Sequence, residues 1–390
     1  MKNPRAISEP GPKELLRWLE ARQGEMTALL HEFVECESPS TEKAAVNAFG
    51  ARVAESFAVL PGARVRVHKL RECGNALQID LPGGCGGGRV LMLGHLDTVY
   101  PVGTLATMPW REHAGRLYGP GVFDMKGGIV MARFALEPLL ERDGGLPVPV
   151  TLLFNPDEET GSAHSRTITA RLAKQARAVL VLEPAAGPHG ALKTSRKGTG
   201  HYLLRVEGRE AHSGLDPEKG ASAVLELARQ LVRIAEFSNP ARGVALNPGV
   251  VRGGTRSNVV AGRAEAEIDA RANSEAQARQ LHQRMLRLKP LDRRCTLEIS
   301  GGMNRPPFEC SAATARLFRL AAAAARELGF TLEEAAVGGG SDGNLTAALG
   351  VPTLDGLGAV GDGAHAAHEH VVAQELPRRA ALLARLLEKL

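Results

Sequence analysis

Histidine and acidic side chains stand directly after three apolar segments of this chain, residues 90–93, 148–154 and 178–182. The polar residues that follow these segments are His95, Asp97, Glu158, Glu159 and Glu183. Short apolar runs of this kind are typical of buried strands, and open α/β sheets bind their ligands at the carboxyl ends of such strands. The pattern therefore predicts that three strand ends deliver polar groups to one site.

The residue types at these strand ends suit metal-dependent hydrolysis. Two further candidates stand elsewhere in the chain, Asp124 and His365. Imidazole and carboxylate ligands without thiolates suit zinc, manganese or cobalt in a hydrolytic site. Two such ions about 3.5–4 Å apart would hold the attacking water and polarise the carbonyl. The sequence thus predicts a hydrolase with two divalent metal ions, with zinc expected before cobalt or manganese.

The segments around these residues are predicted to form helices and strands that position the site. Apolar residues at helical spacing predict two helices over residues 13–57, separated near Pro39. Residues 64–68 and 75–81 are expected to form strands, and residues 125–140 a helix. The expected fold class is α/β, with a mixed, mostly parallel sheet flanked by helices.

The pattern changes in the middle of the chain. Strand, helix, strand, strand, helix and strand are predicted in turn at 201–207, 221–237, 243–252, 262–270, 274–288 and 295–300. This β-α-β-β-α-β order is that of a ferredoxin-like unit. We therefore expect a discontinuous catalytic domain, residues 1–193 and 309–390, with a ferredoxin-like dimerisation or lid domain inserted at residues 194–308.

The composition limits the classes of protein that this chain can belong to. Its 390 residues, 44% of them hydrophobic, are enough for two globular domains. The net charge of +5 is scattered and aromatic residues make up only 4%, which argues against nucleic-acid binding. The five cysteines are odd in number and show no close pairing, which argues against a disulfide framework; they are Cys36, Cys73, Cys85, Cys295 and Cys310.

The amino terminus predicts the compartment. Charged residues occur throughout residues 1–25, so the apolar core of a signal peptide is missing there. No later run reaches the roughly 18 apolar residues of a membrane span. We expect a cytoplasmic protein with no membrane partner.

Five ordered motifs resemble the signatures of one enzyme family. The motifs are GHLDT at 94–98, GVFDMKGG at 121–128, DEETGS at 157–162, LEP at 182–184 and AHAAHE at 364–369. Together they resemble the co-catalytic zinc peptidases, a family that contains glutamate carboxypeptidase, acetylornithine deacetylase, succinyl-diaminopimelate desuccinylase and aminoacylase. The resemblance covers nearly the whole chain, including the inserted domain.

This resemblance implies a ligand set. Asp124 would bridge the two ions. One ion would be bound by His95 and Glu183, and the other by Glu159 and His365. His368 competes with His365 for the last position, but the family has its ligand histidine four residues before a glutamate, here Glu369.

The remaining acids of the motifs would act on the water and on the ligands. Glu158 would be the general base that takes a proton from the attacking water and passes it to the leaving amine, a role worth about 10²–10⁴-fold in rate. Asp97 would accept the N–H of His95 and so fix the tautomer of that ring.

The inserted domain also carries segments that resemble the family. The match implies that His212 polarises the oxyanion, often at the site of a partner subunit. Asn258 and Arg271 would hold the substrate carboxylate, since a guanidinium binds a carboxylate through two hydrogen bonds. Arg305 and Gly340, in the glycine-rich loop, are weaker candidates for the same pocket.

The expected function is hydrolysis of a peptide or N-acyl amino acid that releases a carboxyl-terminal amino acid, as in the glutamate carboxypeptidase branch. Deacetylase or dipeptidase activity is the alternative within the family. A non-catalytic carboxylate-binding protein on the same fold is the alternative from another class, and the presence of Glu158 and all five ligands argues against it. The expected partners are a small carboxylate substrate and a second copy of the chain.

Overall fold

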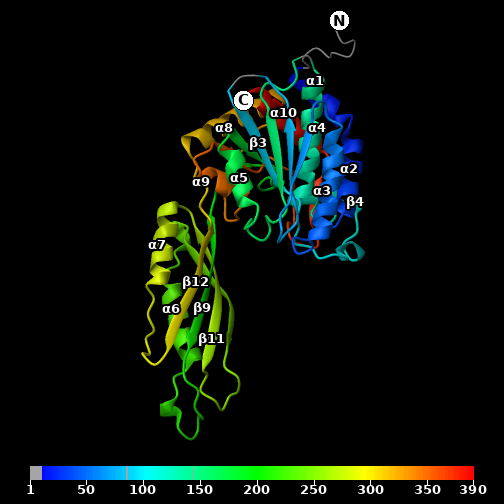
Figure 1. Ribbon diagram of the computed structural model, residues 1–390. Helices are drawn as coiled ribbons and strands as arrows, with labels where there is room; N and C mark the ends of the chain where they lie inside the picture. Colours follow the sequence, from blue (N-terminus) through cyan, green and yellow to red (C-terminus); the bar gives the residue numbers. More distant parts are fainter. Residues whose placement is uncertain (1–10, 85–86, 143) are drawn as a thin grey trace. The chain divides into compact units, whose positions relative to one another are not determined.

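The computed structural model describes residues 11–84, 87–142 and 144–390, which form two compact units (Figure 1). Unit 1 holds the described residues up to Ser195 together with Cys310–Val337 and Ser341–Leu390. Unit 2 holds Arg196–Glu309 and the short segment Gly338–Gly340. The predicted breaks after residues 193 and 308 lie close to these, but the glycine segment was expected in the first domain. Cys85 and the first ten residues lie outside the described residues.

A six-stranded sheet forms the centre of unit 1, with the strand order β1-β2-β6-β3-β7-β14. Its strands are β1 (Arg64–His68), β2 (Ala76–Leu81), β3 (Arg89–His95), β6 (Val150–Asn155), β7 (Ala176–Val181) and β14 (Thr353–Leu354). β3 runs parallel to both β6 and β7, and β14 runs parallel to β7, whereas β1 and β2 are antiparallel. The predicted mixed, mostly parallel sheet is confirmed.

Alternate residues of the central strands face two different layers of helices. Val90 and Met92 of β3 belong to the larger core cluster, while Leu91 and Leu93 belong to the smaller one. The larger cluster is covered by α1 (Pro12–Glu20), α2 (Gln23–Glu35), α3 (Lys43–Ala58), α4 (Gly127–Glu141), α8 (Ala312–Glu327) and α10 (Glu375–Glu388). The smaller cluster is covered by α5 (Arg166–Ala173), beside which α9 (Asp342–Ala348) packs. Burial on both faces explains why these strands are apolar throughout rather than alternating.

The amino-terminal helices differ from the prediction in number. Residues 13–57 were expected to contain two helices, but α1 and α2 are separate, with a break at Ala21–Arg22. The apolar spacing continues across this break, so the pattern alone does not reveal the change of direction. In the described ranges, no helix has the length and apolar character needed to cross a membrane.

Several short elements of unit 1 were not predicted. β4 (Arg111–His113), β5 (Arg116–Tyr118), β15 (Gly361–Asp362) and β16 (His370–Val372) form a small sheet in the order β15-β16-β5-β4. β8 (Leu192–Arg196) pairs with β13 (Glu334–Val337). Their two to five residues are too few for a period of two to be recognised in the sequence.

Unit 2 is an antiparallel four-stranded sheet with two helices. Its elements are β9 (Gly198–Glu207), α6 (Ala223–Ala235), β10 (Ala245–Gly253), β11 (Arg263–Ala272), α7 (Glu275–Leu286) and β12 (Thr296–Arg305). The strand order β10-β11-β9-β12 and the β-α-β-β-α-β sequence confirm the ferredoxin-like prediction. Tyr202, Leu204 and Val206 alternate along β9 into a core that both helices share. The hydroxyls of Ser222 and Ser274 accept from backbone N–H groups and cap α6 and α7.

A buried arginine on α10 holds two loops of unit 1 together. The guanidinium of Arg379 donates to the carbonyl oxygens of Gly358 (3.1 Å), Gly190 (2.8 Å) and Gly356 (2.5 Å). Gly358 in turn donates its N–H to the carbonyl oxygen of Glu183, a predicted metal ligand, at 2.8 Å. Burial lowers the pKa of Arg379 to about 10, so its side chain stays charged at neutral pH.

We expect Arg379→Met to lower the free energy of unfolding by about 3 kcal/mol or more, because it leaves three carbonyl oxygens without a charged donor. The matched control is Arg378→Met, since Arg378 is partly exposed and paired with Glu375. Its loss should cost no more than about 1 kcal/mol. Urea unfolding of both variants measures the difference, and equal losses would contradict the anchoring role of Arg379.

Candidate metal centre

The carboxyl ends of three neighbouring parallel strands converge in unit 1. β6, β3 and β7 lie side by side in the sheet. His95 is the last residue of β3, Asp157–Glu159 follow β6, and Glu183 follows β7. The parallel direction of the strands places all three ends at one edge. The three strand ends thus lie together, as the sequence pattern predicted.

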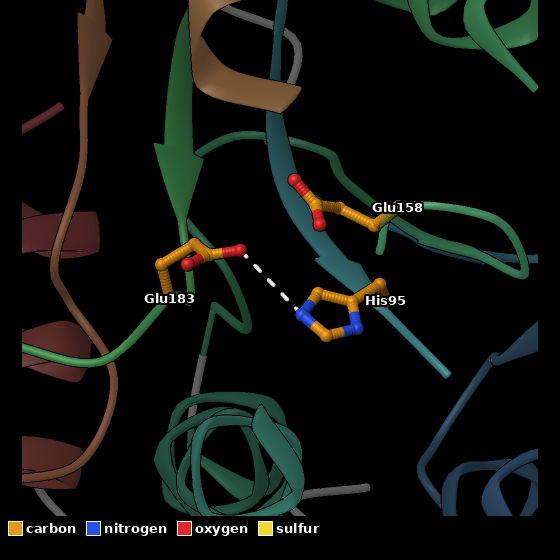
Figure 2. Close-up of side chains that lie close together, drawn as sticks. All are labelled: His95, Glu158 and Glu183. Carbon is orange, nitrogen blue, oxygen red and sulfur yellow. Dashed lines mark ion pairs between the residues drawn. The ribbon is translucent and has the colours of Figure 1, made fainter. Parts of the chain in front are cut away.

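The ring of His95 faces two acids. Its Nε2 lies 3.2 Å from Oδ1 of Asp124 and 3.5 Å from Oε1 of Glu183. Figure 2 shows the ring and the carboxylates of Glu158 and Glu183 pointing toward a common space. The opposite nitrogen, Nδ1, lies 2.9 Å from the backbone oxygen of Asp97. A hydrogen bond from Nδ1 to that oxygen leaves the lone pair of Nε2 available to a metal ion.

A second histidine faces the other oxygen of Asp124. Nε2 of His365 lies 3.4 Å from Oδ2 of Asp124 and 3.1 Å from Glu159. The carboxylate of Asp124 therefore stands between two imidazoles, with one oxygen toward each. The structure places His365 rather than His368 beside these acids; His368 is exposed, and its carbonyl oxygen lies 3.0 Å from Nδ1 of His370.

The spacing of these groups fits metal ligation. A tetrahedral zinc site with bonds of about 2.0–2.1 Å places its ligand atoms about 3.3–3.4 Å apart. The contacts among the two imidazoles and their acids span 3.1–3.5 Å. His95 and Glu183 form one group and His365 and Glu159 another, and Asp124 is shared by both. The donor set therefore fits two divalent ions bridged by one carboxylate.

The electrostatics of the centre also call for cations. Burial alone lowers the pKa of His95, but hydrogen bonds and charges from Asp124 and Asp97 outweigh it and raise that pKa well above its usual value. Hydrogen bonds that His365 donates to the carboxylates of Asp124 and Glu159 likewise raise its pKa to about 10. Burial raises the pKa of Glu159. The raised pKa values of the two histidines reflect the carboxylates that face them, whose charge two divalent ions would neutralise.

Asp97 faces His95 with both its carboxylate and its main chain. Its carboxylate was predicted to accept the N–H of His95; a carboxylate oxygen lies 3.5 Å from Nδ1, and the backbone oxygen of Asp97 is closer at 2.9 Å. The two carboxylate oxygens also accept the backbone N–H groups of Glu158 and Glu159, each at 3.1 Å. Oδ2 also accepts the hydroxyl of Ser40 at 2.7 Å. Asp97 thus holds the loop of the adjacent glutamates, and it orients His95 through its main chain.

Ser40 was missed as a contributor to the site. In the sequence it was considered only as a residue that opens a helix. The neighbouring Pro39 forms a bridge with Thr98, and this bridge brings the serine hydroxyl to Asp97. A contact between residues 57 positions apart leaves no signal in local spacing.

Two predicted substrate residues lie together in unit 2. The loop that carries His212 runs beside the loop that carries Asn258, with the N–H of Ser213 donating to the carbonyl oxygen of Asn258 at 3.0 Å. Both residues are exposed. Nδ1 of His212 accepts the N–H of Gly214 at 3.1 Å, so its Nε2 carries the proton and can donate to an oxyanion.

The other predicted substrate residues form a second group. Thr199 of β9 is paired with Arg271 on one side and with Arg305 on the other, so the three side chains share one face of the sheet. A side chain at Gly340 would press against Thr199 and Arg305 at 3.0 Å, which explains the glycine there. Nε of Arg271 donates to Asp269 at 2.8 Å.

These two groups lie at opposite ends of unit 2. Asn258 belongs to the loop that leads into Arg263, and Arg271 follows eight positions later on β11. At about 3.4 Å per residue, the strand separates the two ends by roughly 27 Å. Asn258 and Arg271 of one chain therefore lie apart by about the length of this strand, and their joint binding of one substrate carboxylate stays a prediction.

Known proteins resemble this chain in sequence. It is 32% identical over 313 residues to carboxypeptidase G2 of Pseudomonas sp. (strain RS-16), which covers 78% of this chain and 74% of that protein. It is 30% identical over 205 residues to acetylornithine deacetylase of Proteus mirabilis (strain HI4320), with 48% and 51% covered.

Structural similarity extends over almost the whole chain. A tripeptidase from Staphylococcus aureus superposes with a TM-score of 0.79 at 19% identity, covering 94% of this chain and 98% of the other. The sequence pattern of peptidase family M20/M25/M40 matches residues 91–389, which include all five candidate ligands. The chain therefore belongs to peptidase family M20/M25/M40, and it is a hydrolase that acts on peptides or N-acyl amino acids.

Proposed function

We propose that this chain is a two-metal carboxypeptidase that cleaves the amide bond before a carboxyl-terminal amino acid, with glutamate as the preferred leaving residue. The observation that carries this proposal is the carboxylate of Asp124, whose two oxygens each face one histidine and its partner acid. Carboxypeptidase G2 as a relative supports the carboxypeptidase branch. The similarity to an acetylornithine deacetylase keeps N-acyl-amino-acid deacetylation as the alternative.

The residues of the centre have distinct roles in this reaction. Two bound divalent ions, which we propose to be zinc, would acidify water and polarise the scissile carbonyl. Glu158 takes a proton from the attacking water and delivers it to the leaving amine. Asp97 holds the backbone of Glu158 at 3.1 Å, so the base keeps its place while it gains and loses the proton.

The carboxylate of the substrate requires a cationic partner. We propose that Arg271 binds it, with Arg305 and Gly340 shaping the same pocket. Thr199 lies between the two arginines in the sheet, so both guanidinium groups are carried on the same face. His212 would donate to the oxygen that becomes negative when the carbonyl is attacked.

The separation between the two groups of unit 2 favours a homodimer. If Arg271 and His212 both serve catalysis, two residues from ends of the unit roughly 27 Å apart must contact the same substrate molecule. Two copies of the chain resolve this requirement, because His212 and Asn258 of one copy can complete the site of the other. Exposed apolar residues on α6 and on the edge strand β10, among them Leu225, Val232 and Val251, offer a surface for the second copy.

Glu158→Gln should lower kcat by about 10²–10⁴-fold, because the amide cannot accept the proton of water. Metal content should stay at two ions per chain, since the proposed ligands are intact. Release of amino acid from N-acyl and N-aroyl amino acids, glutamate conjugates included, measures kcat, and elemental analysis measures the metal. Glu55→Gln, at an exposed position of α3, is the control. A variant that keeps its activity would refute Glu158 as the base and point to a different base in the site.

His365→Ala should reduce the bound metal from two ions to about one per chain, because the second ion then loses its only imidazole. His368→Ala is the matched control, three residues away and exposed, and should keep both ions. Both proteins are reconstituted with zinc, cobalt or manganese and dialysed before metal analysis. The reverse result would assign the ligand position to His368.

Mixing two inactive variants tests the shared site. Arg271→Ala and His212→Ala should each be inactive, but exchange of subunits should restore about a quarter of wild-type activity. The reason is that half of the dimers are mixed and each mixed dimer has one complete site. Two affinity tags isolate the mixed dimer. If purified mixed dimers stay inactive, the two residues do not act from different copies.

A further inference from the structure

A buried glutamate next to the candidate metal centre accepts four hydrogen bonds. Glu369 is fully buried and lies four residues after His365. Its Oε1 accepts the backbone N–H groups of Phe123 (2.8 Å) and Asp124 (2.9 Å). Its Oε2 accepts the N–H of Gly121 at 3.0 Å. One carboxylate thus gathers three N–H groups of the segment that carries the bridging aspartate.

Tyr100 completes this arrangement from a third segment. Its hydroxyl lies 2.6 Å from Oε2 of Glu369 and 3.1 Å from the carbonyl oxygen of Ala366, the residue after His365. Tyr100 itself follows the motif with His95 and Asp97. The hydroxyl and the carboxylate therefore join the three segments that supply His95, Asp124 and His365.

The backbone of these segments needs such support. Asp124 has non-helical dihedral angles (φ −114°, ψ 92°) between Gly121 and α4, so its N–H cannot enter a regular helical ladder. An N–H buried there without an acceptor would destabilise the segment. His365 has φ of 63°, in the left-handed region, where a non-glycine residue is strained. The contact of Tyr100 with Ala366 restrains the turn that contains this residue.

We propose that Tyr100 and Glu369 are positioning residues that hold Asp124 and His365 at the separation that two metal ions require. Neither side chain is among the proposed ligands, so both act through the backbone of the ligands. This inference rests on the proposed two-metal function and extends it to a pair of residues outside the ligand set. Groups that orient metal ligands typically contribute 10–100-fold to metal affinity or activity.

The two substitutions remove different parts of the arrangement. Tyr100→Phe deletes one hydroxyl, which frees the turn at Ala366 but leaves the three N–H groups on Glu369. Glu369→Gln replaces one carboxylate oxygen by an amide NH₂, so a donor then faces a backbone N–H donor. We therefore expect zinc affinity to fall by about ten-fold in Tyr100→Phe and by up to about 100-fold in Glu369→Gln.

The test measures zinc binding to the metal-free full-length protein in competition with a chromophoric chelator. Unit 2 offers matched controls: Tyr202, whose hydroxyl meets Nδ1 of His282 at 3.1 Å, and Glu226, which accepts the N–H groups of Leu291 and Asp292. Tyr202→Phe and Glu226→Gln remove equivalent buried hydrogen bonds away from the centre. Both should keep wild-type zinc affinity even if they lower the unfolding temperature.

Catalysis provides the second readout. Because the ligands remain, excess zinc should restore kcat in Tyr100→Phe, with KM unchanged throughout. If the two residues only stabilised the fold, their substitution would lower the amount of folded protein. The zinc affinity of the chains that remain folded would then stay at the wild-type value. Tyr100→Phe removes a single oxygen, so it keeps the proposal testable if Glu369→Gln does not fold.

Wild-type zinc affinity in both Tyr100→Phe and Glu369→Gln would overturn the positioning role while leaving the two-metal function intact. If the wild-type chain itself bound no zinc, cobalt or manganese, the proposed function would fail, and this inference with it. Weaker binding in the two variants, with both controls unchanged, is the result that supports it.

Discussion

The concentration of negative charge at one edge of a buried sheet is the constraint on which this structure depends. Four carboxylates, from Asp124, Glu158, Glu159 and Glu183, surround the imidazole of His95 and approach that of His365. Carboxylates held so closely in a site of low polarity repel one another unless cations or protons balance them. The neighbouring carboxylates raise the pKa values of the two histidines accordingly.

The fold holds these acids in place through the main chain of the loops. Asp97 binds the N–H groups of the adjacent glutamates, and Glu369 binds those of the Asp124 segment. Arg379 is a donor rather than an acceptor: its guanidinium donates to carbonyl oxygens of the loop that supports Glu183. Side chains that are themselves fixed by burial thus determine the position of each ligand, so a metal ion meets a site that is already shaped.

Unit 2 follows a different principle. Its core needs only alternation along β9 and β11 and the apolar faces of two helices. The strand length separates His212 and Asn258 from Arg271 and Arg305, so one copy presents two distinct polar ends. An elongated unit of this kind suits a protein whose site draws residues from more than one chain.

The sequence by itself determined the chemistry and the fold class. Apolar runs ending in acids and histidines indicated the strands β3, β6 and β7 and their convergence, and the β-α-β-β-α-β order indicated unit 2, because local periodicity follows from which faces are buried. Only the tertiary structure decided the contacts that depend on distant segments. The bond of Asp97 to Ser40 and its bonds to the backbone of Glu158 and Glu159 arise from packing between segments far apart in the chain. Such contacts are set by the geometry of the whole fold, so no local spacing of residues records them.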